Sequence, residues 1–221
     1  MPRIARVCVE GYPHHITQRG NNKEKVFFDE EDRQFYLEVL RRYGNKHGIK
    51  ILAYCLMENH VHILGIPEKA LSLAKGIGGT NLIYTQYMHR KYKRSGRVWQ
   101  NRFFSSVVEE EPYLWAVINY IEENPVRANI VKRAEEYQWS SARAHVEGIN
   151  DKMLSKENYF SDKERIEYGK ILGQQNENMN TMIRKATATG RPLGGELFLR
   201  KLEKTLGRNL LPMKVGRPKR K

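Results

Sequence analysis

The sequence is poor in cysteine and has no long apolar run. Cys8 and Cys55 are its only cysteines, too few and too far apart for a zinc ribbon or a disulfide framework. No stretch approaches the ~18 consecutive apolar residues typical of a membrane-spanning helix. The basic N-terminal residues are not followed by the apolar segment of a secretion signal. We therefore expect a reduced, cytoplasmic protein that makes no contact with a membrane.

Acidic residues are missing from two long stretches. Residues 69–108 and 207–221 contain no Asp or Glu, and six of the last fifteen residues are Lys or Arg. Over the whole chain, 39 Lys and Arg stand against 25 Asp and Glu, which gives a net charge of +14 and a pI near 9.8. A charge excess of one sign favours a polyanionic partner such as nucleic acid. The alternative is a basic surface that is merely solvated.

Hydrophobic periodicity and turn residues predict an alternation of strands and helices. In chain order we expect a strand running into a loop (14–22), a helix ending near Gly44 or Gly48 (29–48), a hairpin turning near residues 57–59 (49–67), a helix interrupted at Gly78-Gly79 (69–96), a further strand (97–108) and a helical segment with a break near Pro125 (109–134). This order predicts a ferredoxin-like α+β fold, in which helices pack on one face of an antiparallel sheet. The open face of the sheet, or its edge, is then left for a ligand.

Composition divides the chain into three parts. Residues 1–147 hold the predicted sheet, and residues 148–189 are polar and loosely patterned, which indicates a linker or a weakly packed helical segment. Residues 190–221 form a basic, mostly helical or extended C-terminal extension, with an amphipathic helix and a basic tail. The tripeptide Gly-Arg-Pro occurs in it at 190–192 and 216–218. The first copy is either a groove-binding arm or a plain loop before a helix, whereas the tail favours contact with nucleic acid.

Two histidines interrupt an apolar strand candidate. In MENHVHILG (57–65), His60 and His62 point to one face of the strand, and Val61 and Ile63 point to the other. Buried imidazoles need partners, because an unsatisfied buried polar group is costly. Either neighbouring groups satisfy both rings, or the two rings hold a metal ion.

A second pair of polar residues lies on a helix candidate. Tyr120 and Asn124 are four residues apart, so on a helix they share a face, and their oxygen atoms could approach a metal held by the histidines. Both residues also have an ordinary structural interpretation. Tyr120 lies among apolar neighbours and could belong to the core, and Asn124 before Pro125 could cap a new helix.

Several motifs together resemble one protein family. The chain resembles the single-tyrosine HUH transposases, and most of all their REP-associated branch. The matching stretches occur in family order within residues 11–145, and they are HHITQRGNN, AYCLMENHVHILG, SGRVWQNRFFSS, YIEENPVRANIV and YQWSSARAH. The stretches GRPLGGELFLRKLE and GRPKRK resemble the C-terminal portion of these proteins. One departure is Glu58, where the family usually has Pro before Asn-His.

The resemblance implies a specific chemistry. His60 and His62 would bind one divalent ion, Mg²⁺ or Mn²⁺, with the amide of Asn124 as a third ligand. Tyr120 would attack a DNA phosphodiester, release a 3′ hydroxyl and keep a 5′-phosphotyrosine link, which a second 3′ hydroxyl then reverses. Residues 1–147 would accordingly form an HUH transposase-like catalytic domain. His15 shares a strand face with Thr17 and Arg19, so it is either a structural histidine satisfied by its neighbours or a group near the metal that supports a ligand or binds phosphate.

The implied substrate is single-stranded or hairpin DNA, from repetitive palindromes or insertion-sequence ends. Aromatic and cationic residues that alternate are a usual means of holding unpaired bases. The candidate DNA contacts are Arg19, Trp99, Gln100, Arg102 and Arg127, with Arg217, Lys219 and Arg220 in the tail.

Two rival functions remain open on the sequence. The chain could be a catalytically silent, domesticated protein that only binds hairpin DNA, or an HxH metal hydrolase acting on a small substrate. The hydrolase would leave the acid-free basic segment unexplained. We expect a monomer in preference to a homodimer, and a cytoplasmic, nucleoid-associated location in a prokaryote.

Overall fold

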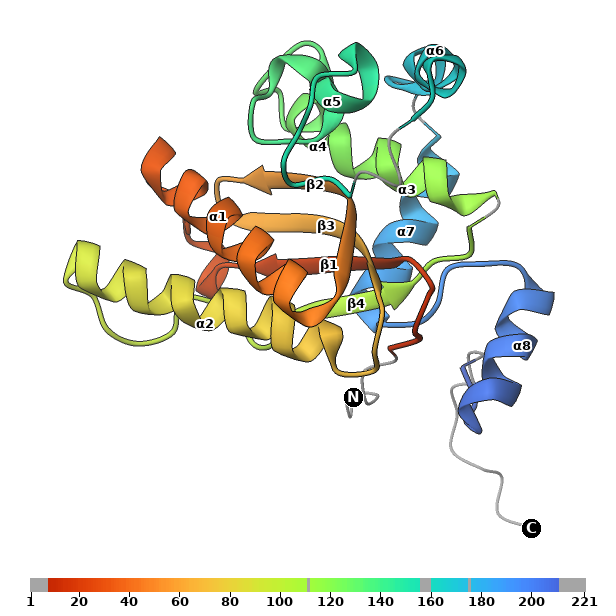
Figure 1. The fold of residues 1–221 in the computed structure, drawn as a ribbon, viewed down its shortest axis with the longest axis horizontal. Coiled ribbons are helices and arrows are strands. Elements are labelled where there is room, and N and C mark those ends of the chain that lie inside the picture. The colour runs from red at the N-terminus through yellow and green to blue at the C-terminus, as the bar shows by residue number, and fades with distance from the viewer. Residues whose placement is uncertain (1–7, 111, 156–159, 175, 211–221) are drawn as a thin grey trace.

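Four strands form one antiparallel sheet in the order β2-β3-β1-β4 (Figure 1). The computed structural model describes residues 8–110, 112–155, 160–174 and 176–210. The strands are β1 (His14–Arg19), β2 (Ile49–Met57), β3 (His60–Pro67) and β4 (Phe104–Val107). They alternate along the chain with α1 (Glu30–His47), α2 (Ser72–Tyr92) and α3 (Tyr113–Glu122), which confirms the predicted order of elements and the α+β class.

Helices α1 and α2 pack together on one face of the sheet (Figure 1). The register pairs Ile16 with Ile63 and Ile63 with Tyr54, so these three apolar side chains share that face. All three belong to the same buried cluster. The alternation of side chains along a strand then directs the neighbouring residues of β1 and β3 to the opposite face. The predicted antiparallel sheet is confirmed, and α1 and α2 are the helices packed on this face.

The ends of α1 follow from its sequence. The Asp29 carboxylate accepts a hydrogen bond from the backbone N–H of Asp32, and the Asp32 side chain accepts one from the backbone of Asp29 in return. This capping box satisfies N–H groups that the first helical turn leaves free. Gly48 ends the helix in the left-handed region at φ 65°, where glycine has no steric penalty. Of the two predicted ends, Gly48 is therefore the correct one.

Helix α2 runs without a break through Gly78-Gly79, so the predicted interruption is wrong. Two glycines of the helix instead allow close packing. A Cβ at Gly76 would lie 2.4 Å from the Cδ1 atom of Ile49, and one at Gly79 would lie 2.5 Å from the ring of Tyr43. Packing against α1 and β2 thus offsets the low helix propensity of glycine.

The opposite face of the sheet is not left open. Helices α3 and α7 (Glu177–Thr189) pack against it, α3 over β2 and β3 and α7 over β4 and β1. In Figure 1 they lie on the other side of the sheet from α1 and α2. Leu64, Ile118 and Ile183 share a second buried cluster there. The expected open face was wrong because α7 comes from residues 148–189, whose polar composition gave no strong periodic signal.

The described part of residues 148–189 holds two helices, α6 (Asp162–Ile171) and α7. Tyr168 of α6 and Ile183 of α7 are buried, so this stretch packs onto the sheet domain at both helices. Residues 190–192 form a connection: Gly190 ends α7 at φ 70°, and the Arg191 carbonyl accepts a hydrogen bond from the Ser106 hydroxyl. The plain-loop interpretation of the first Gly-Arg-Pro is therefore the one that the structure shows.

Smaller elements complete the described chain. They are the 3-10 turns η1 (Asn21–Lys23) and η2 (Ala134–Glu136) and the helices α4 (Asn124–Arg127), α5 (Ala142–Glu147) and α8 (Glu196–Leu206). The predicted amphipathic helix is α8, and it ends at Gly207 in the left-handed region. None of the helices in the described ranges is both long and apolar enough to cross a membrane.

One buried carboxylate joins three helices. Glu122 of α3 is fully buried, and its oxygen atoms accept hydrogen bonds from His145 Nδ1 (2.7 Å), the Ser141 hydroxyl and the Tyr168 hydroxyl (2.6 Å). These partners come from α5, from the residue before α5 and from α6. Because low dielectric makes an unpaired buried group costly, this network fixes α3 relative to the C-terminal helices.

Replacing Glu122 should destabilise the fold strongly. In Glu122→Ala, the buried donors of His145 and Tyr168 lose their acceptor. Removal of one member of a buried polar pair typically costs about 3–5 kcal/mol. Urea unfolding followed by circular dichroism measures this loss. The control is Glu147→Ala, which removes a solvent-exposed i,i+4 ion pair with Arg143 and should change the unfolding free energy by less than about 1 kcal/mol. Equal losses in the two variants would contradict the structural role of Glu122.

Candidate active site

The register between β1 and β3 places the histidine pair. Arg19 lies opposite His60 and Thr17 lies opposite His62, on the face that carries α3 and α7. Val61 and Ile63 point into the other core, beneath α1 and α2. The predicted division of the HxH strand into a polar and an apolar side is therefore present in the structure.

Helix α3 brings Tyr120 against these rings. The Tyr120 ring centroid lies 5.8 Å from that of His62 and 5.8 Å from that of His15, edge to face in both cases. The centroids of His60 and His62 are 5.1 Å apart. Tyr120 is 8% exposed and His62 is 7% exposed, whereas His60 is only partly buried. The four side chains thus form one cluster that opens to solvent on the His60 side.

The hydrogen bonds of His60 fix which ring nitrogen is free. Its Nδ1 atom lies 2.6 Å from Asn59 Oδ1, and Asn59 Nδ2 donates to the Lys23 carbonyl at 2.9 Å. Because a carbonyl only accepts, the amide orientation of Asn59 is determined, and Oδ1 accepts from Nδ1–H of His60. The Nε2 atom of His60 therefore carries the lone pair that a metal ion requires.

Hydrogen bonds to two backbone carbonyls likewise determine the orientation of the Asn124 amide. Its Nδ2 atom donates to the carbonyls of Tyr120 and Ile121, both at 3.0 Å. Pro125 has no N–H to donate to the Ile121 carbonyl, so the side chain of Asn124 supplies the missing donor. The side-chain oxygen Oδ1 is left over for a ligand. Asn124 thus caps the end of α3 and remains suited to metal binding, so the two interpretations of the sequence are compatible.

The residues present fit a divalent ion. Two imidazole nitrogens and one amide oxygen are suitable donors, and they leave open positions for phosphate and water. No group of three or more His, Cys, Asp or Glu residues suited to a metal occurs in the described ranges. Any metal in this cluster would therefore depend on the amide of Asn124 or on the substrate for its further ligands.

Two arginines flank the tyrosine. Arg127 of α4 lies over the Tyr120 ring at 4.4 Å from the centroid and donates to the Tyr120 carbonyl at 2.5 Å. Arg184 of α7 pairs with Glu177 at 2.6 Å, and this pairing, with a smaller contribution from the Tyr120 side chain, raises the pKa of the Arg184 guanidinium. Sequence reasoning named Arg127 but missed Arg184 and the rest of α7. The only signal for α7 was a weak apolar spacing in a polar segment.

Three predicted DNA contacts lie together at the end of the sheet where His60 begins β3. Arg19, Gln100 and Arg102 are exposed, and the backbone N–H of Gln100 donates to the Arg19 carbonyl at 2.8 Å. The neighbouring loops are tied to the same end, since Gly20 N–H donates to the Asn59 carbonyl at 2.8 Å. The loop after α2 and the histidine pair are therefore held close to one another.

Trp99 is a core residue, which corrects its prediction as a DNA contact. It is 8% exposed, it packs against the rings of Tyr36 and Tyr84, and its indole N–H donates to the Asn81 carbonyl. Its ring therefore has no free face for a base. The predicted contacts in the tail lie outside the described residues, and they are Arg217, Lys219 and Arg220.

Burial keeps the histidines of this face neutral. It lowers the pKa of His15 from 6.5 to about 3 and, together with the charge of Arg19, the pKa of His60 to about 4. Burial chiefly, and then the neighbouring His60, also holds the pKa of His62 well below its usual value. Neutral imidazoles are the form that binds metal ions.

The sequence matches a known protein family over more than half of its length. Residues 8–124 match the family model described as "Transposase IS200 like". This is more than half of the 221 residues. The match places the protein among the DNA transposases. The chain belongs to the IS200-like transposase family, as the motifs of the sequence indicated.

Two individual proteins are similar to the chain. A Haemophilus influenzae protein named as a candidate REP-associated tyrosine transposase is 25% identical over 122 residues, which are 50% of this chain and 66% of the relative, slightly under two thirds. The structure of a REP-associated tyrosine transposase bound to a REP hairpin has a TM-score of 0.54 at 15% identity. It covers 80% of this chain and 99% of that chain. This second match shows a shared fold.

The folded state should lose stability as the pH falls through weakly acidic values. Burial lowers the pKa of His14 from 6.5 to about 4, and it also lowers the pKa values of His15, His60 and His62. Between about pH 6.5 and 4 the unfolded chain therefore binds protons that the folded chain excludes, and each such histidine removes up to about 1.4 kcal/mol per pH unit. Urea unfolding of the metal-free protein, with chelator present, at pH 7.5, 6 and 5 measures this loss. Stability that is constant or rises as the pH falls would refute it.

Proposed function

We propose that the protein cleaves and rejoins single-stranded or hairpin DNA through a 5′-phosphotyrosine link at Tyr120. The observation that carries the proposal is the contact between Tyr120 and His62, whose ring centroids lie 5.8 Å apart. It joins a nucleophile on a rigid helix to a histidine pair on a buried strand. Membership of a transposase family makes DNA the expected substrate. Repetitive palindromes and insertion-sequence ends are the substrate class that we favour.

The proposed reaction conserves the number of phosphodiester bonds. The Tyr120 oxygen forms a bond to phosphorus as the bond from phosphorus to the 3′ oxygen breaks, and the hydroxyl proton ends on that departing oxygen. A second 3′ hydroxyl later attacks the same phosphorus and releases Tyr120. No external energy source is needed, because each step exchanges one ester for another.

The residues around Tyr120 have separate tasks in this scheme. His60, His62 and Asn124 would hold Mg²⁺ or Mn²⁺, which when bound polarises the phosphate and orients it for in-line attack. Arg127 holds the tyrosine through its ring face and its carbonyl. The remaining N–H groups of Arg127, and the partly exposed guanidinium of Arg184, are suited to bind phosphate oxygens.

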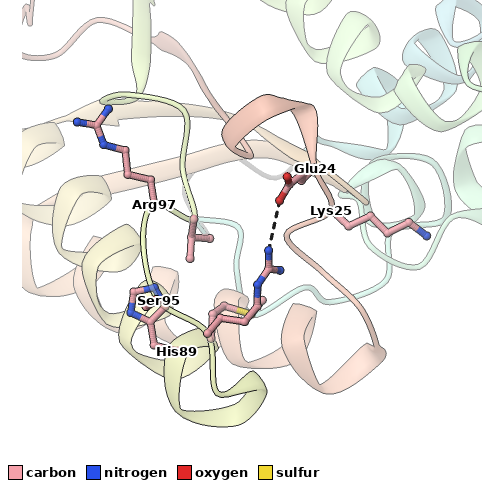
Figure 2. Close-up of a pocket in the computed structure, with 8 residues that line it drawn as sticks. Glu24, Lys25, His89, Ser95 and Arg97 are labelled. Atoms are coloured by element: carbon pink, nitrogen blue, oxygen red, sulfur yellow. Dashed lines mark hydrogen bonds and ion pairs between the residues drawn. The ribbon is translucent and has the colours of Figure 1, made fainter.

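DNA would approach from the basic end of the sheet. The loop between α2 and β4 carries exposed Arg94, Arg97 and Arg102 without any acid. Figure 2 shows a small pocket under this loop, with Glu24 turned inward and Lys25 and Arg97 extending away from it on opposite sides. Lys25 pairs with Glu58, whereas the exposed Arg97 is suited to meet a phosphate backbone that leads to His60 and Arg19.

A second candidate function is binding of hairpin DNA without chemistry. The burial of Tyr120 and His62, at 8% and 7% exposed, favours it, because a scissile phosphate must reach both side chains. The exposed edge at His60 and the arginine beside Tyr120 favour the catalytic function. Covalent trapping decides between the two.

The proposed oligomeric state is a monomer that acts in cis. Tyr120 lies against His62 and His15 of its own chain, so no second subunit is needed to supply the nucleophile. Helix α7 also occupies the sheet face beside these residues. A mass measurement in solution that gave a stable dimer would oppose this part of the proposal.

Replacing Tyr120 should abolish covalent capture and leave DNA binding. The protein is incubated with Mg²⁺ or Mn²⁺ and 3′-labelled hairpin DNA from its own genomic neighbourhood, then run on a denaturing gel. We expect a labelled, slower protein band that disappears in Tyr120→Phe and with chelator, while a native gel still shows binding. Tyr113→Phe, on the same helix, is the matched control and should keep the band.

Two outcomes of the trapping assay would oppose the catalytic proposal. A band that persists in Tyr120→Phe would exclude Tyr120 as the nucleophile. A native-gel shift without any band, for several hairpins, would favour the binding function. An active small-substrate hydrolase would keep its activity in Tyr120→Phe.

Replacing Arg19 should weaken DNA binding by an electrostatic contribution. Loss of one phosphate contact lowers the magnitude of the slope of log K against log salt by about 0.7 to 1. Fluorescence anisotropy with labelled single-stranded DNA at several salt concentrations measures the slope for Arg19→Ala. Arg143→Ala, whose guanidinium is exposed on α5 and paired with Glu147, should keep the slope of the unchanged chain. A similar change in both variants would show that only net charge matters.

A further inference from the structure

A chain of hydrogen bonds connects α7 to His62. The Thr187 hydroxyl lies 2.9 Å from His15 Nδ1, and His15 Nε2 lies 2.9 Å from His62 Nδ1. The Thr187 hydroxyl also donates to the Ile183 carbonyl of its own helix at 2.8 Å. His15 and His62 are buried, and their rings are nearly parallel, at an interplanar angle of 16° with centroids 5.1 Å apart. The chain thus runs from a helix backbone to one histidine of the pair.

The chemistry of each member fixes the direction of the hydrogen bonds. Because the single hydroxyl hydrogen of Thr187 goes to the Ile183 carbonyl, the oxygen of Thr187 must accept from Nδ1–H of His15. His15 is enclosed, with no carboxylate among its hydrogen-bond partners in the described residues, so its ring is neutral. A neutral His15 with hydrogen on Nδ1 has a lone pair on Nε2. That lone pair can only accept from Nδ1–H of His62.

We propose that Thr187 and His15 are positioning residues that hold His62 in the form with hydrogen on Nδ1 and a free lone pair on Nε2. The proposal rests on the proposed function, in which His62 binds a metal ion through Nε2. Hydrogen-bond partners of metal-binding histidines commonly set the tautomer and the orientation of the ring. Here the last member of the chain is a threonine from α7, far along the sequence from the histidine pair.

Buried side chains fix the position of helix α7 beside His15. Ile183 and Ala186 are buried in the cluster that also contains Tyr120. Arg184, one turn before Thr187, interacts with the Tyr120 side chain. Helix α7 therefore contacts both His15, the hydrogen-bond partner of His62, and Tyr120, the proposed nucleophile. Arg184 and Thr187 of α7 accordingly belong to the active site in addition to the fold.

The other histidine of the pair has a different support. His60 is oriented by Asn59, from the hairpin turn, whereas the hydrogen bonds that start at Thr187 end at His62. The hydrogen-bond relay, defined as Thr187, His15 and His62 in that order, should therefore act on His62 alone. This difference provides an internal standard, because His60 can be observed in the same sample.

The first test is the tautomer of His62 in metal-free, DNA-free protein. Imidazole ¹⁵N chemical shifts distinguish Nδ1–H from Nε2–H forms. In the unchanged chain we expect His62 in the Nδ1–H form, and in Thr187→Val a mixture, because His15 loses its fixed acceptor. His60 should be the same in both. Thr187→Ser, which keeps the hydroxyl, should restore the tautomer of the unchanged chain.

The matched control is Thr189→Val. The Thr189 hydroxyl makes the same type of bond, to the Lys185 carbonyl at 2.7 Å, but Thr189 is exposed near the end of α7. Any general effect of a valine in α7 should appear in both variants, and the effect on His62 only in Thr187→Val. An unchanged His62 tautomer in Thr187→Val would overturn the relay, as would equal shifts in both variants.

The second test is Mn²⁺ affinity by isothermal titration calorimetry. We expect Thr187→Val to bind Mn²⁺ about 10-fold more weakly than the unchanged chain, the lower end of the effect of losing an outer hydrogen-bond partner. Thr187→Ser and Thr189→Val should bind as the unchanged chain does. If Thr187→Val also binds equally well, the relay has no role in metal binding and the proposal is wrong.

The failure of the relay differs from the failure of the proposed function. If the unchanged chain binds no Mn²⁺, the proposed metal site is wrong, whatever the tautomer of His62. If it binds Mn²⁺ and forms the covalent DNA link, but Thr187→Val matches it in tautomer and affinity, only the relay is wrong.

Discussion

The antiparallel register between β1 and β3 is the constraint on which the site depends. It places His62 opposite Thr17 and His60 opposite Arg19. Because side chains alternate along a strand, a slip of one residue would turn both imidazoles into the apolar core beneath α1 and α2. The apolar residues Ile16 and Ile63 oppose such a slip, since they would then face the polar side. The apolar core beneath α1 and α2 thus fixes the register that places His60 and His62 on the opposite face.

Polar networks add to apolar packing in holding the tyrosine helix in place. Glu122 ties α3 to α5 and α6, and Asn124 and Arg127 satisfy the carbonyls at its end. The relay through His15 adds α7 on the other side of Tyr120. Buried networks of this kind are costly when incomplete, so they favour a single arrangement of the helices. A nucleophile that must meet a phosphate at short range benefits from that rigidity.

Local sequence patterns predicted the helices and strands. They failed where contacts between distant elements determined the structure. The order of strands and helices, the hairpin turn near Asn59 and the end of α1 at Gly48 all followed from periodicity and turn chemistry. The glycines of α2 did not break it, and two of them, Gly76 and Gly79, lie where Ile49 and Tyr43 approach closely. Trp99 has an aromatic side chain that could stack on a base, yet it is buried against Tyr84. Sequence spacing alone cannot show which face of a loop or helix another element covers.

The sequence by itself determined the fold class, the division of the HxH strand into two faces and the family. These depend on periodicities and on motifs that are local in the chain. Only the tertiary structure decided that α7 covers the second face and that Thr187 meets His15. Those contacts join residues 172 positions apart, between a strand and a polar helix. No local pattern encodes such a contact, because it depends on how the whole chain packs.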